Sequence, residues 1–321
     1  MAIGLKLKYA SATADVVGAT PGIIVTPLGD RDSWESRLRH AVRPHFAQSW
    51  CHGEGRRAEG WRVERLLFAE GEEPLALCQV LWKRPLGMPI ARIEHGPSFL
   101  HETMPAELQL AVLRAVRRRW RFGLHGLLLL SPALPQGEQS VRLLREAGFW
   151  QREARGASAT VIDLRLPLDE THRQLTSDWR TRIRRARRFG ISLRLRRDAA
   201  AVDWLLDRAP EERQAGVPAA RSPDFYREAF AASPRDFCLL QAMVNGEPEA
   251  GILLGRSGQH SSRLLSWSRK GTRQATAVSF LLWNTIIEMQ RAGCQTLDLG
   301  ADAPRGVGGT PVRFAGEWLA L

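Results

Sequence analysis

Residues 178–197, DWRTRIRRARRFGISLRLRR, hold nine arginines within twenty positions. Trp179, Ile183 and Ala186 recur at spacings of four and three residues, which predicts a helix with one narrow apolar stripe. Arginines occupy the other faces of that helix. Because guanidinium groups bind phosphate in a bidentate manner, the segment predicts either an anion-binding surface or an ordinary solvated helix face.

The same segment indicates which elements must present these arginines. Gly190 suits the left-handed backbone position at which many helices end. Ile191, Leu193 and Leu195 then alternate with polar residues, which is the period of a half-buried strand. We therefore predict a very basic helix that is held against a sheet by a narrow apolar seam.

The bulk composition favours polyanionic partners. The chain has 321 residues, enough for two domains of roughly 100–200 residues each. Its hydrophobic fraction of 44% and charged fraction of 25% are ordinary globular values. The net charge of +12 and the isoelectric point near 10.7 are high. They favour nucleic acid, phosphorylated ligands or an anionic membrane face as partners.

The cysteines and the apolar stretches predict no disulfide framework, no metal site and no membrane span. The four cysteines lack the spacing of a disulfide framework, which favours a reducing compartment. Cys51, His52 and His45 have no second ligand pair at a recognised spacing, so we predict no metal site. The N-terminus lacks the apolar core of a signal peptide, and no stretch approaches ~18 apolar residues. We expect a cytoplasmic protein without a transmembrane segment.

One succession of elements is predicted twice. The first half has expected strands, a long helix and a buried strand at 62–69, 75–82, 90–93, 105–122 and 127–130. The second half has the same order at 237–244, 250–254, 262–268, 275–292 and 296–299. Such a repeat implies two similar α/β (α+β) domains, and the order is that of an acetyltransferase (GNAT) core. We assign a tail (1–20), a first domain (21–157) and a second domain (158–321), and allow the C-terminal strand to return to the first.

Six short motifs follow one another along the chain. They are Phe46, Gln48, Ser49 and Trp50 with Arg56, Arg57, Gly60 and Trp61; then Gly96 and Pro97; Gly148 and Phe149; residues 179–193; residues 297–300; and Val312, Arg313 and Phe314. In this order they resemble the motifs of the Fem family (FemABX). Its members are aminoacyl-tRNA-dependent transferases that build peptidoglycan cross-bridges.

The resemblance implies a compact fold of two tandem GNAT-like domains. The segment 199–235 is too short for the coiled-coil arm of some members, so we expect none. It also implies an aminoacyltransferase (EC 2.3.2 type) that forms a peptide bond and takes aminoacyl-tRNA as co-substrate, with no bound cofactor. One departure stands out: the family has a lysine at the reacting centre after the terminal Phe, and Ala315 replaces it here.

Two residues are candidates for direct roles in the reaction. Asp298, at the end of a buried strand, is a candidate to orient or deprotonate the attacking amine, or else to cap a turn. Arg313 is the candidate oxyanion stabiliser in place of the absent lysine. A Ser-His-Asp or Cys-His constellation is not required, because an aminoacyl ester is already activated and positioning supplies much of the rate enhancement.

Other residues are candidates for binding. Trp50, Arg56 and Arg57 resemble the region that holds the phosphates of the acceptor, unless they form an exposed basic loop with Trp50 docked in the core. Arg182 and Arg185 on the basic helix are candidates for phosphate or tRNA. Arg269 and Lys270 precede the second long helix, where a GNAT domain binds pyrophosphate.

Three functions remain open from the sequence. The first is aminoacyl transfer from tRNA to an amine acceptor. That acceptor is a peptidoglycan stem peptide, soluble or lipid-linked at the inner membrane face, or a small peptide-like metabolite. The second is acyl-CoA-dependent N-acyl transfer, which the single Gly271 before the long helix supports weakly. The third is a non-catalytic RNA-binding module, which the loss of the lysine at Ala315 would suit. The amino acid, the tRNA and the oligomeric state are not indicated.

Overall fold

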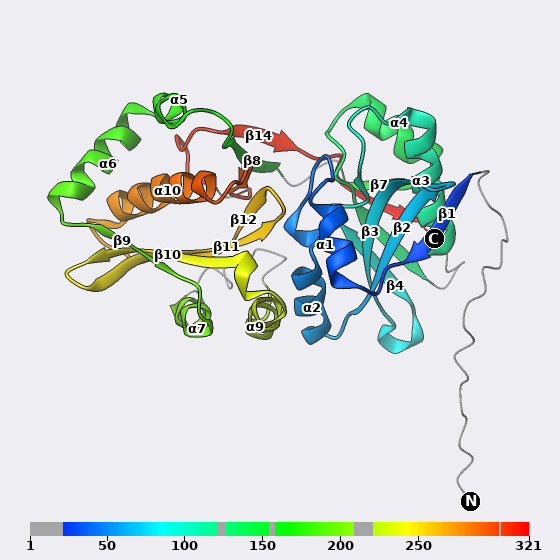
Figure 1. The fold of residues 1–321 in the computed structure, drawn as a ribbon, viewed down its shortest axis with the longest axis horizontal. Helices are drawn as coiled ribbons and strands as arrows, with labels where there is room; N and C mark the ends of the chain where they lie inside the picture. Colours follow the sequence, from blue (N-terminus) through cyan, green and yellow to red (C-terminus); the bar gives the residue numbers. More distant parts are fainter. Residues whose placement is uncertain (1–21, 121–125, 154–157, 209–220, 302, 321) are drawn as a thin grey trace, which may run out of the picture.

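The computed structural model describes residues 22–120, 126–153, 158–208, 221–301 and 303–320. These residues form two mixed sheets, side by side, each with helices on both faces (Figure 1). The predicted tail at 1–20 and residues 209–220 of the segment 199–235 lie outside the described residues. Within the described ranges, no helix has the length and apolar character needed to cross a membrane.

The first sheet has the strand order β1-β2-β3-β4-β6-β15-β7, and β5 pairs with β3. The strands are β1 (Ile23–Pro27), β2 (Arg62–Glu70), β3 (Glu73–Lys83), β4 (Ile90–Glu94), β5 (Ser98–Phe99), β6 (Leu127–Ser131), β7 (Trp150–Glu153) and β15 (Glu317–Ala320). The helices of this domain are α1 (Arg31–Leu38), α2 (Trp50–Ala58), α3 (Ala106–Arg119) and α4 (Glu138–Glu146).

The second sheet has the order β14-β8-β13-β12-β11-β10-β9. The strands are β8 (Ser158–Asp163), β9 (Ser192–Arg196), β10 (Phe237–Val244), β11 (Glu247–Ser257), β12 (His260–Ser268), β13 (Thr296–Asp298) and β14 (Thr310–Arg313). Its helices are α5 (Leu168–Gln174), α6 (Ser177–Arg188), α7 (Ala199–Arg208), α9 (Pro223–Ala232) and α10 (Gln274–Arg291). The two sheets are therefore two copies of one strand order.

The two sheets exchange one strand each. β8 follows β7 of the first sheet in the chain, yet it lies between β13 and β14 of the second sheet. β15 follows β14 of the second sheet, yet it lies between β6 and β7 of the first. Because each strand is hydrogen-bonded on both sides, the domains cannot separate without opening both sheets.

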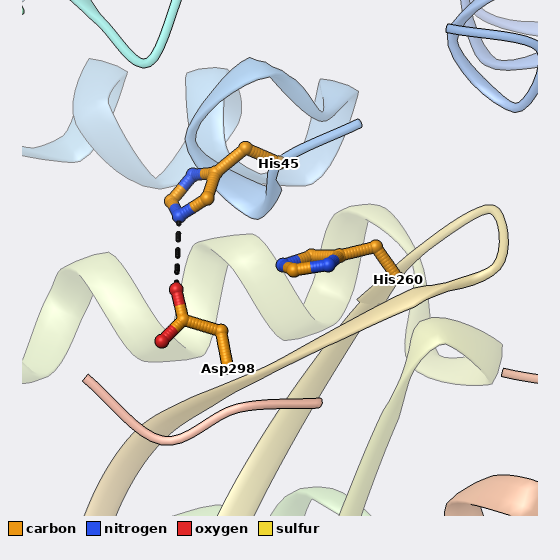
Figure 2. A group of neighbouring side chains, drawn as sticks. All are labelled: His45, His260 and Asp298. Atoms are coloured by element: carbon orange, nitrogen blue, oxygen red, sulfur yellow. Dashed lines mark ion pairs between the residues drawn. The ribbon is translucent and has the colours of Figure 1, made fainter. Parts of the chain in front are cut away.

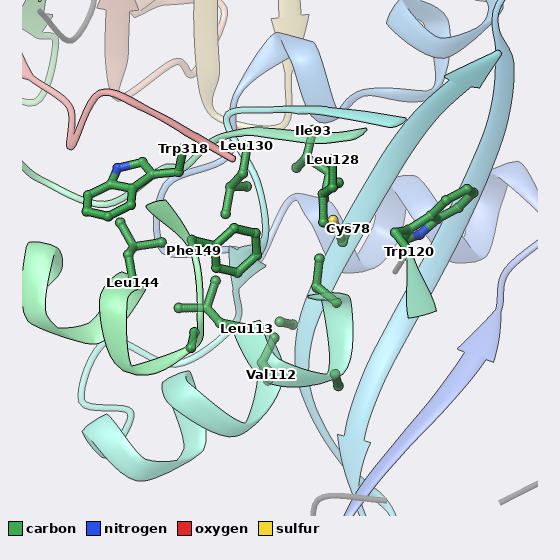
Figure 3. Close-up of a cluster of buried hydrophobic side chains, with 14 of the residues drawn as sticks. Cys78, Ile93, Val112, Leu113, Trp120, Leu128, Leu130, Leu144, Phe149 and Trp318 are labelled. Carbon is green, nitrogen blue, oxygen red and sulfur yellow. The ribbon is translucent and has the colours of Figure 1, made fainter. Parts of the chain in front are cut away.

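Three apolar clusters hold these layers together. The first lies between the first sheet and α3 and α4, and its fully buried side chains include Trp318, Phe149 and Leu113 (Figure 3). The second lies between the second sheet and α6 and α10. The third crosses the domain boundary, because Phe46 and Cys51 of the first domain pack with α7 and α9 of the second.

Helix α2 departs from the sequence prediction, which placed a loop there. A Cβ atom at Gly55 would lie 2.6 Å from the Phe225 carbonyl oxygen, so the contact between α2 and α9 requires glycine at this position. Gly53 is similarly crowded, by Arg65 and Gln79. Both glycines lower the intrinsic helix propensity and hide the helix from sequence patterns, whereas tertiary packing stabilises it.

The other predicted strands and helices are present, with shifts of a few residues at their ends. Four short strands, β1, β5, β7 and β14, and helix α5 were not predicted, and the C-terminal strand β15 was predicted without bounds. Strands of five residues or fewer hold too few alternations to show a period.

Replacing Trp318 by Ala is expected to destabilise the protein by about 3–5 kcal/mol, because it empties a fully buried site on the exchanged strand. Urea unfolding at neutral pH measures the difference. Trp150→Ala is the matched control: Trp150 lies in neighbouring β7 but is 61% exposed, so we expect a loss of about 0.5 kcal/mol or less. Equal losses in the two variants would contradict a core role for β15.

Candidate active site between the two domains

A cleft of about 620 Å³ lies between the two domains. His45, His52 and the ends of β4 and β6 form its first-domain wall. Arg221, the start of α9 and strands β12 and β13 form its second-domain wall. The crossing segment that joins β14 to β15 contributes Phe314 and Gly316. The crossing from β14 to β15 therefore takes part in shaping the cleft.

One side of the cleft is a cluster of two arginines and one histidine around Glu94. Arg221 Nη2 lies 2.7 Å from Glu94 Oε2, and Arg92 Nε lies 3.1 Å from Glu94 Oε1. His52 Nε2 lies 3.3 Å from Glu94 Oε2. The Glu94 side chain is 9% exposed, whereas those of Arg92 and Arg221 are 36% and 20% exposed. The guanidinium groups thus face the cleft above a buried carboxylate, an arrangement suited to an anionic ligand.

The other side of the cleft is centred on Asp298 (Figure 2). His45 Nε2 lies 3.4 Å from Asp298 Oδ2, and the Gly300 N–H donates to Asp298 Oδ1 at 2.7 Å. His260, on neighbouring β12, is hydrogen-bonded to Thr296 Oγ1 at 2.6 Å. His45 comes from the first domain and Asp298 from the second, so this contact exists only in the assembled pair of domains.

The loop after β4 completes the site. His95 follows Glu94 directly and has a φ of +50°, a left-handed conformation that is uncommon for a residue with a side chain. Its ring stacks on that of His45 with centroids 3.6 Å apart, and Phe314 meets it edge-on at 4.9 Å. The strained backbone therefore places an aromatic stack at the domain boundary.

Burial and neighbouring charges shift the ionisation of these groups. Burial opposes ionisation of Glu94, but His52, Arg221 and Arg56 outweigh it and hold its pKa well below the usual range. Burial also opposes ionisation of Asp298, but His45 and the Gly300 N–H hold its pKa at about 2. Both groups are carboxylates at neutral pH and are weak proton acceptors.

His45, His260 and Asp298 are the one described group whose ligand atoms, all within 4.8 Å of one another, could hold a metal ion. However, His45 Nδ1 accepts a hydrogen bond from the Ala47 N–H, which leaves the ring proton on Nε2, the atom that faces Asp298. A metal at Nε2 would have to displace that proton. The geometry therefore favours a hydrogen-bonded His–Asp pair, and the absence of a metal stays a prediction.

Comparison with known proteins identifies the architecture. Residues 173–306 match the family model described as an acetyltransferase (GNAT) domain. The solved structure of FemX superposes with a TM-score of 0.77 at 12% identity, over 92% of this chain and 96% of FemX. The chain has the FemX-like tandem GNAT fold.

Two further solved structures share this fold. One is a conserved protein of unknown function from Bacteroides thetaiotaomicron, with a TM-score of 0.61 at 12% identity over 92% of this chain and 99% of that one. The other is the C-terminal domain of a protein described as a lysylphosphatidylglycerol synthetase from Agrobacterium fabrum, with a TM-score of 0.50 at 14% identity over 85% and 78%. No curated protein matches. The fold and the GNAT match support an acyltransferase-type function.

Of the predicted reacting residues, the tandem GNAT fold brings only Asp298 into the cleft. Arg313 lies on β14 between Val312 and Phe314, and its side chain is exposed. Because successive residues of a strand face opposite sides, the ring of Phe314 reaches the cleft and the Arg313 guanidinium does not. The predicted oxyanion role of Arg313 is thus corrected. Ala315, in place of the family lysine, is buried in the first-domain core.

The first of the six motifs, residues 46–61, has mainly a structural role. The ring of Trp50 packs under Arg65, whose guanidinium carbon lies 3.6 Å from the ring centroid, and does not line the cleft. Arg57 is exposed and pairs with Glu54. Arg56 is buried and reaches Glu94 at 3.8 Å, so it is the one member of this predicted trio that contacts the site. The alternative of an exposed basic loop is therefore wrong, because the segment forms helix α2, and the binding of the acceptor by these residues stays a prediction.

The remaining predicted residues lie away from the cleft. Helix α6 packs against α10 on the outer side of the second domain (Figure 1). On it, Arg182 pairs with Asp178, and Arg185 is exposed. The basic helix therefore lies on an outer surface, away from the groove between the domains. Arg269 and Lys270 follow the far end of β12 and do not line the cleft. The binding of tRNA or phosphate by Arg182, Arg185, Arg269 and Lys270 stays a prediction, and it concerns surfaces outside the cleft.

Sequence patterns missed most of the residues that line the cleft. These include His45, His52, Arg92, Glu94, His95 and Arg221. Glu94 and His95 follow a predicted strand directly, and a run of polar residues at a strand end is a signal that could have found them. Arg221 and His45 come from irregular segments whose distance in the chain gives no sign that they face one cleft.

Two buried histidines, His52 and His260, and the half-buried His95 make the fold acid-sensitive. Burial lowers the pKa of His52 and His260 to about 4, and that of His95 well below its usual value. The unfolded chain takes up protons on these groups below about pH 6.5, whereas the folded protein does not. Stability is therefore full above that pH and decreases as the pH falls, by on the order of 1 kcal/mol per histidine at pH 5.5.

Urea unfolding at pH 7.5 and 5.5 measures this loss, and His260→Gln should reduce it by about a third. His101→Gln is the control, since the His101 side chain is 42% exposed. The assignment is wrong if the pH dependence of His260→Gln equals that of the unsubstituted protein.

Proposed function

We propose that this protein transfers an amino acid from aminoacyl-tRNA to an amine acceptor and forms a peptide bond. One observation carries the proposal: the cleft between two GNAT-type domains has arginines on one side and an ionised carboxylate on the other. Arginines suit the phosphates of an acceptor, and the carboxylate suits an ammonium group. The acceptor is a peptidoglycan precursor or a small peptide-like metabolite.

The reaction needs positioning more than acid–base chemistry. The acceptor amine attacks the ester carbonyl carbon; a C–N bond forms and the C–O bond to the terminal ribose breaks. The ribose oxygen leaves as a hydroxyl and takes the proton that the amine loses. Because the ester is already activated, holding the two groups in contact can supply much of the rate enhancement.

The two carboxylates suit binding rather than proton abstraction. A general base works best with a pKa near the operating pH, and the pKa of Asp298 is about 2. His45 already uses Nδ1 to accept from the Ala47 N–H. We therefore infer that Asp298 orients a cationic group, and that the acceptor amine arrives as its free base.

The identity of the donor substrate distinguishes the candidate functions, and this identity can be tested directly. We expect radiolabel to move from tRNA charged with a mixture of amino acids to an amine-containing peptidoglycan precursor, and RNase treatment to abolish the transfer. Label that moves only from acyl-CoA would replace the proposal with N-acyl transfer. Binding of tRNA with a steep salt dependence, but no transfer from either donor, would indicate a binding module.

N-acyl transfer from acyl-CoA is the second candidate, and the GNAT match over residues 173–306 favours it. In that case the pyrophosphate would bind near the N-terminus of α10, where Gly271 has a φ of +150°. The cleft residues do not include that loop. The aminoacyl-tRNA proposal therefore explains more of the site.

Pyrophosphate is a simple probe for the phosphate side of the cleft. We expect the double variant Arg92→Ala, Arg221→Ala to bind pyrophosphate at least about tenfold more weakly by calorimetry, because each guanidinium contributes a charge-assisted hydrogen bond. Arg182→Ala with Arg185→Ala removes the same charge from α6 and should leave this affinity within about twofold. Circular dichroism checks that both variants fold. A similar loss in both pairs would mean that only net charge matters.

A further inference from the structure

A second cavity lies behind the cleft. This inner chamber has a volume of about 340 Å³, which is at the lower end of the range for small-molecule sites. It shares one layer of side chains with the cleft. The shared residues are His45, His95, Asp298 and Phe314. The two cavities thus adjoin along a layer of side chains that includes the Asp298 carboxylate.

Beside its histidines and other polar residues, the lining of the inner chamber has three parts that bear on the choice of ligand. Asp298, 7% exposed, supplies a buried negative charge. Val161, Val312 and Phe314 supply apolar surface. Arg39 and Arg43 are exposed and therefore lie toward solvent, and neither guanidinium is paired with an acid in the part of the chain that the structure describes.

These parts complement a molecule with three matching features. An ammonium group would be stabilised by the buried carboxylate. An apolar side chain would be desolvated against the valines and Phe314. An anionic group at the far end would meet the two exposed arginines. The α-aminoacyl end of a charged nucleotide has all three features: an α-ammonium, a side chain and a neighbouring phosphate.

Asp298 also decides which substrate the chamber suits. A carboxylate that remains ionised favours the charged form of an adjacent amine. That would hinder a nucleophile, which must be a free amine, but it suits the α-ammonium of the donor, which does not react.

We propose that the inner chamber binds the aminoacyl end of the donor, with its α-ammonium at Asp298, an apolar side chain against Val161 and Val312, and a phosphate at Arg39 and Arg43. This inference rests on the proposed function. The acceptor then approaches from the cleft, so that the two substrates meet where the two cavities adjoin. The donor amino acid has an apolar side chain.

The probe is the 5′-phosphate of 3′-deoxy-3′-(L-leucylamino)adenosine, in which a stable amide replaces the ester. We expect it to bind in calorimetry, and expect N-acetylation of its α-amine or Asp298→Asn to weaken binding at least about 30-fold. Removing the 5′-phosphate, or substituting both Arg39 and Arg43 by Ala, should each cost about tenfold. A glutamyl analogue, whose side chain is anionic, should bind at least tenfold more weakly than the leucyl one.

Two substitutions at one position test the location. Val312→Trp fills the chamber and should abolish binding of the analogue, whereas Val312→Ala leaves room for it and should retain binding. Thermal unfolding checks that both variants fold, and pyrophosphate binding should be unchanged in both. Equal affinity in Val312→Trp and the unsubstituted protein would overturn the proposal, as would tight binding of the N-acetylated analogue.

The outcomes also separate this inference from the proposed function. Binding that depends on Asp298, without any transfer from charged tRNA, would support the chamber and reject the transferase. Transfer from charged tRNA that Val312→Trp leaves unchanged would support the transferase and reject the chamber.

Discussion

The exchange of one strand between the two sheets is the constraint on which the site depends. β8 pairs with β13 so that Val161 lies opposite Asp298, and β8 arrives directly from the first domain. Phe314 lies just before the exchanged strand β15, whose Trp318 is buried in the first core. The cleft is therefore bounded by segments that cannot move apart while both sheets remain closed. A shared apolar cluster around Phe46 adds to the same restraint.

Within this rigid frame, two carboxylates are kept ionised by different surroundings. Glu94 is surrounded by arginines and His52. Asp298 instead has His45 and the Gly300 N–H as its hydrogen-bond partners. An incoming anion meets partly exposed guanidinium groups at the first, and an incoming cation meets the largely buried Asp298 carboxylate, which lines the cleft, at the second. The site thus separates opposite charges along one cavity, which orients a substrate that carries both.

The two copies of the fold have diverged where their strands meet the cleft. β4 of the first domain pairs with β6 as far as its last residue, Glu94, and the chain then turns at His95. β12 of the second domain pairs with β13 only as far as Ser262 and continues for six more residues. The first domain therefore contributes a closed strand end with charged groups, whereas the second contributes an opening between strands beside Asp298.

Local patterns in the sequence determined the repeat, most strands and helices, the strand order of a GNAT core and the place of Asp298 at a strand end, because these depend on neighbours a few positions apart. The tertiary structure alone decided the rest. Helix α2 contains two glycines that only its contacts with α9 and β3 explain. His45, Glu94 and Arg221 are far apart in the chain and meet because the strand exchange joins the domains. The basic helix α6 was conspicuous in sequence, yet it faces outward, since its narrow apolar stripe packs on α10. Charge density along a chain does not specify which surface encloses a cavity.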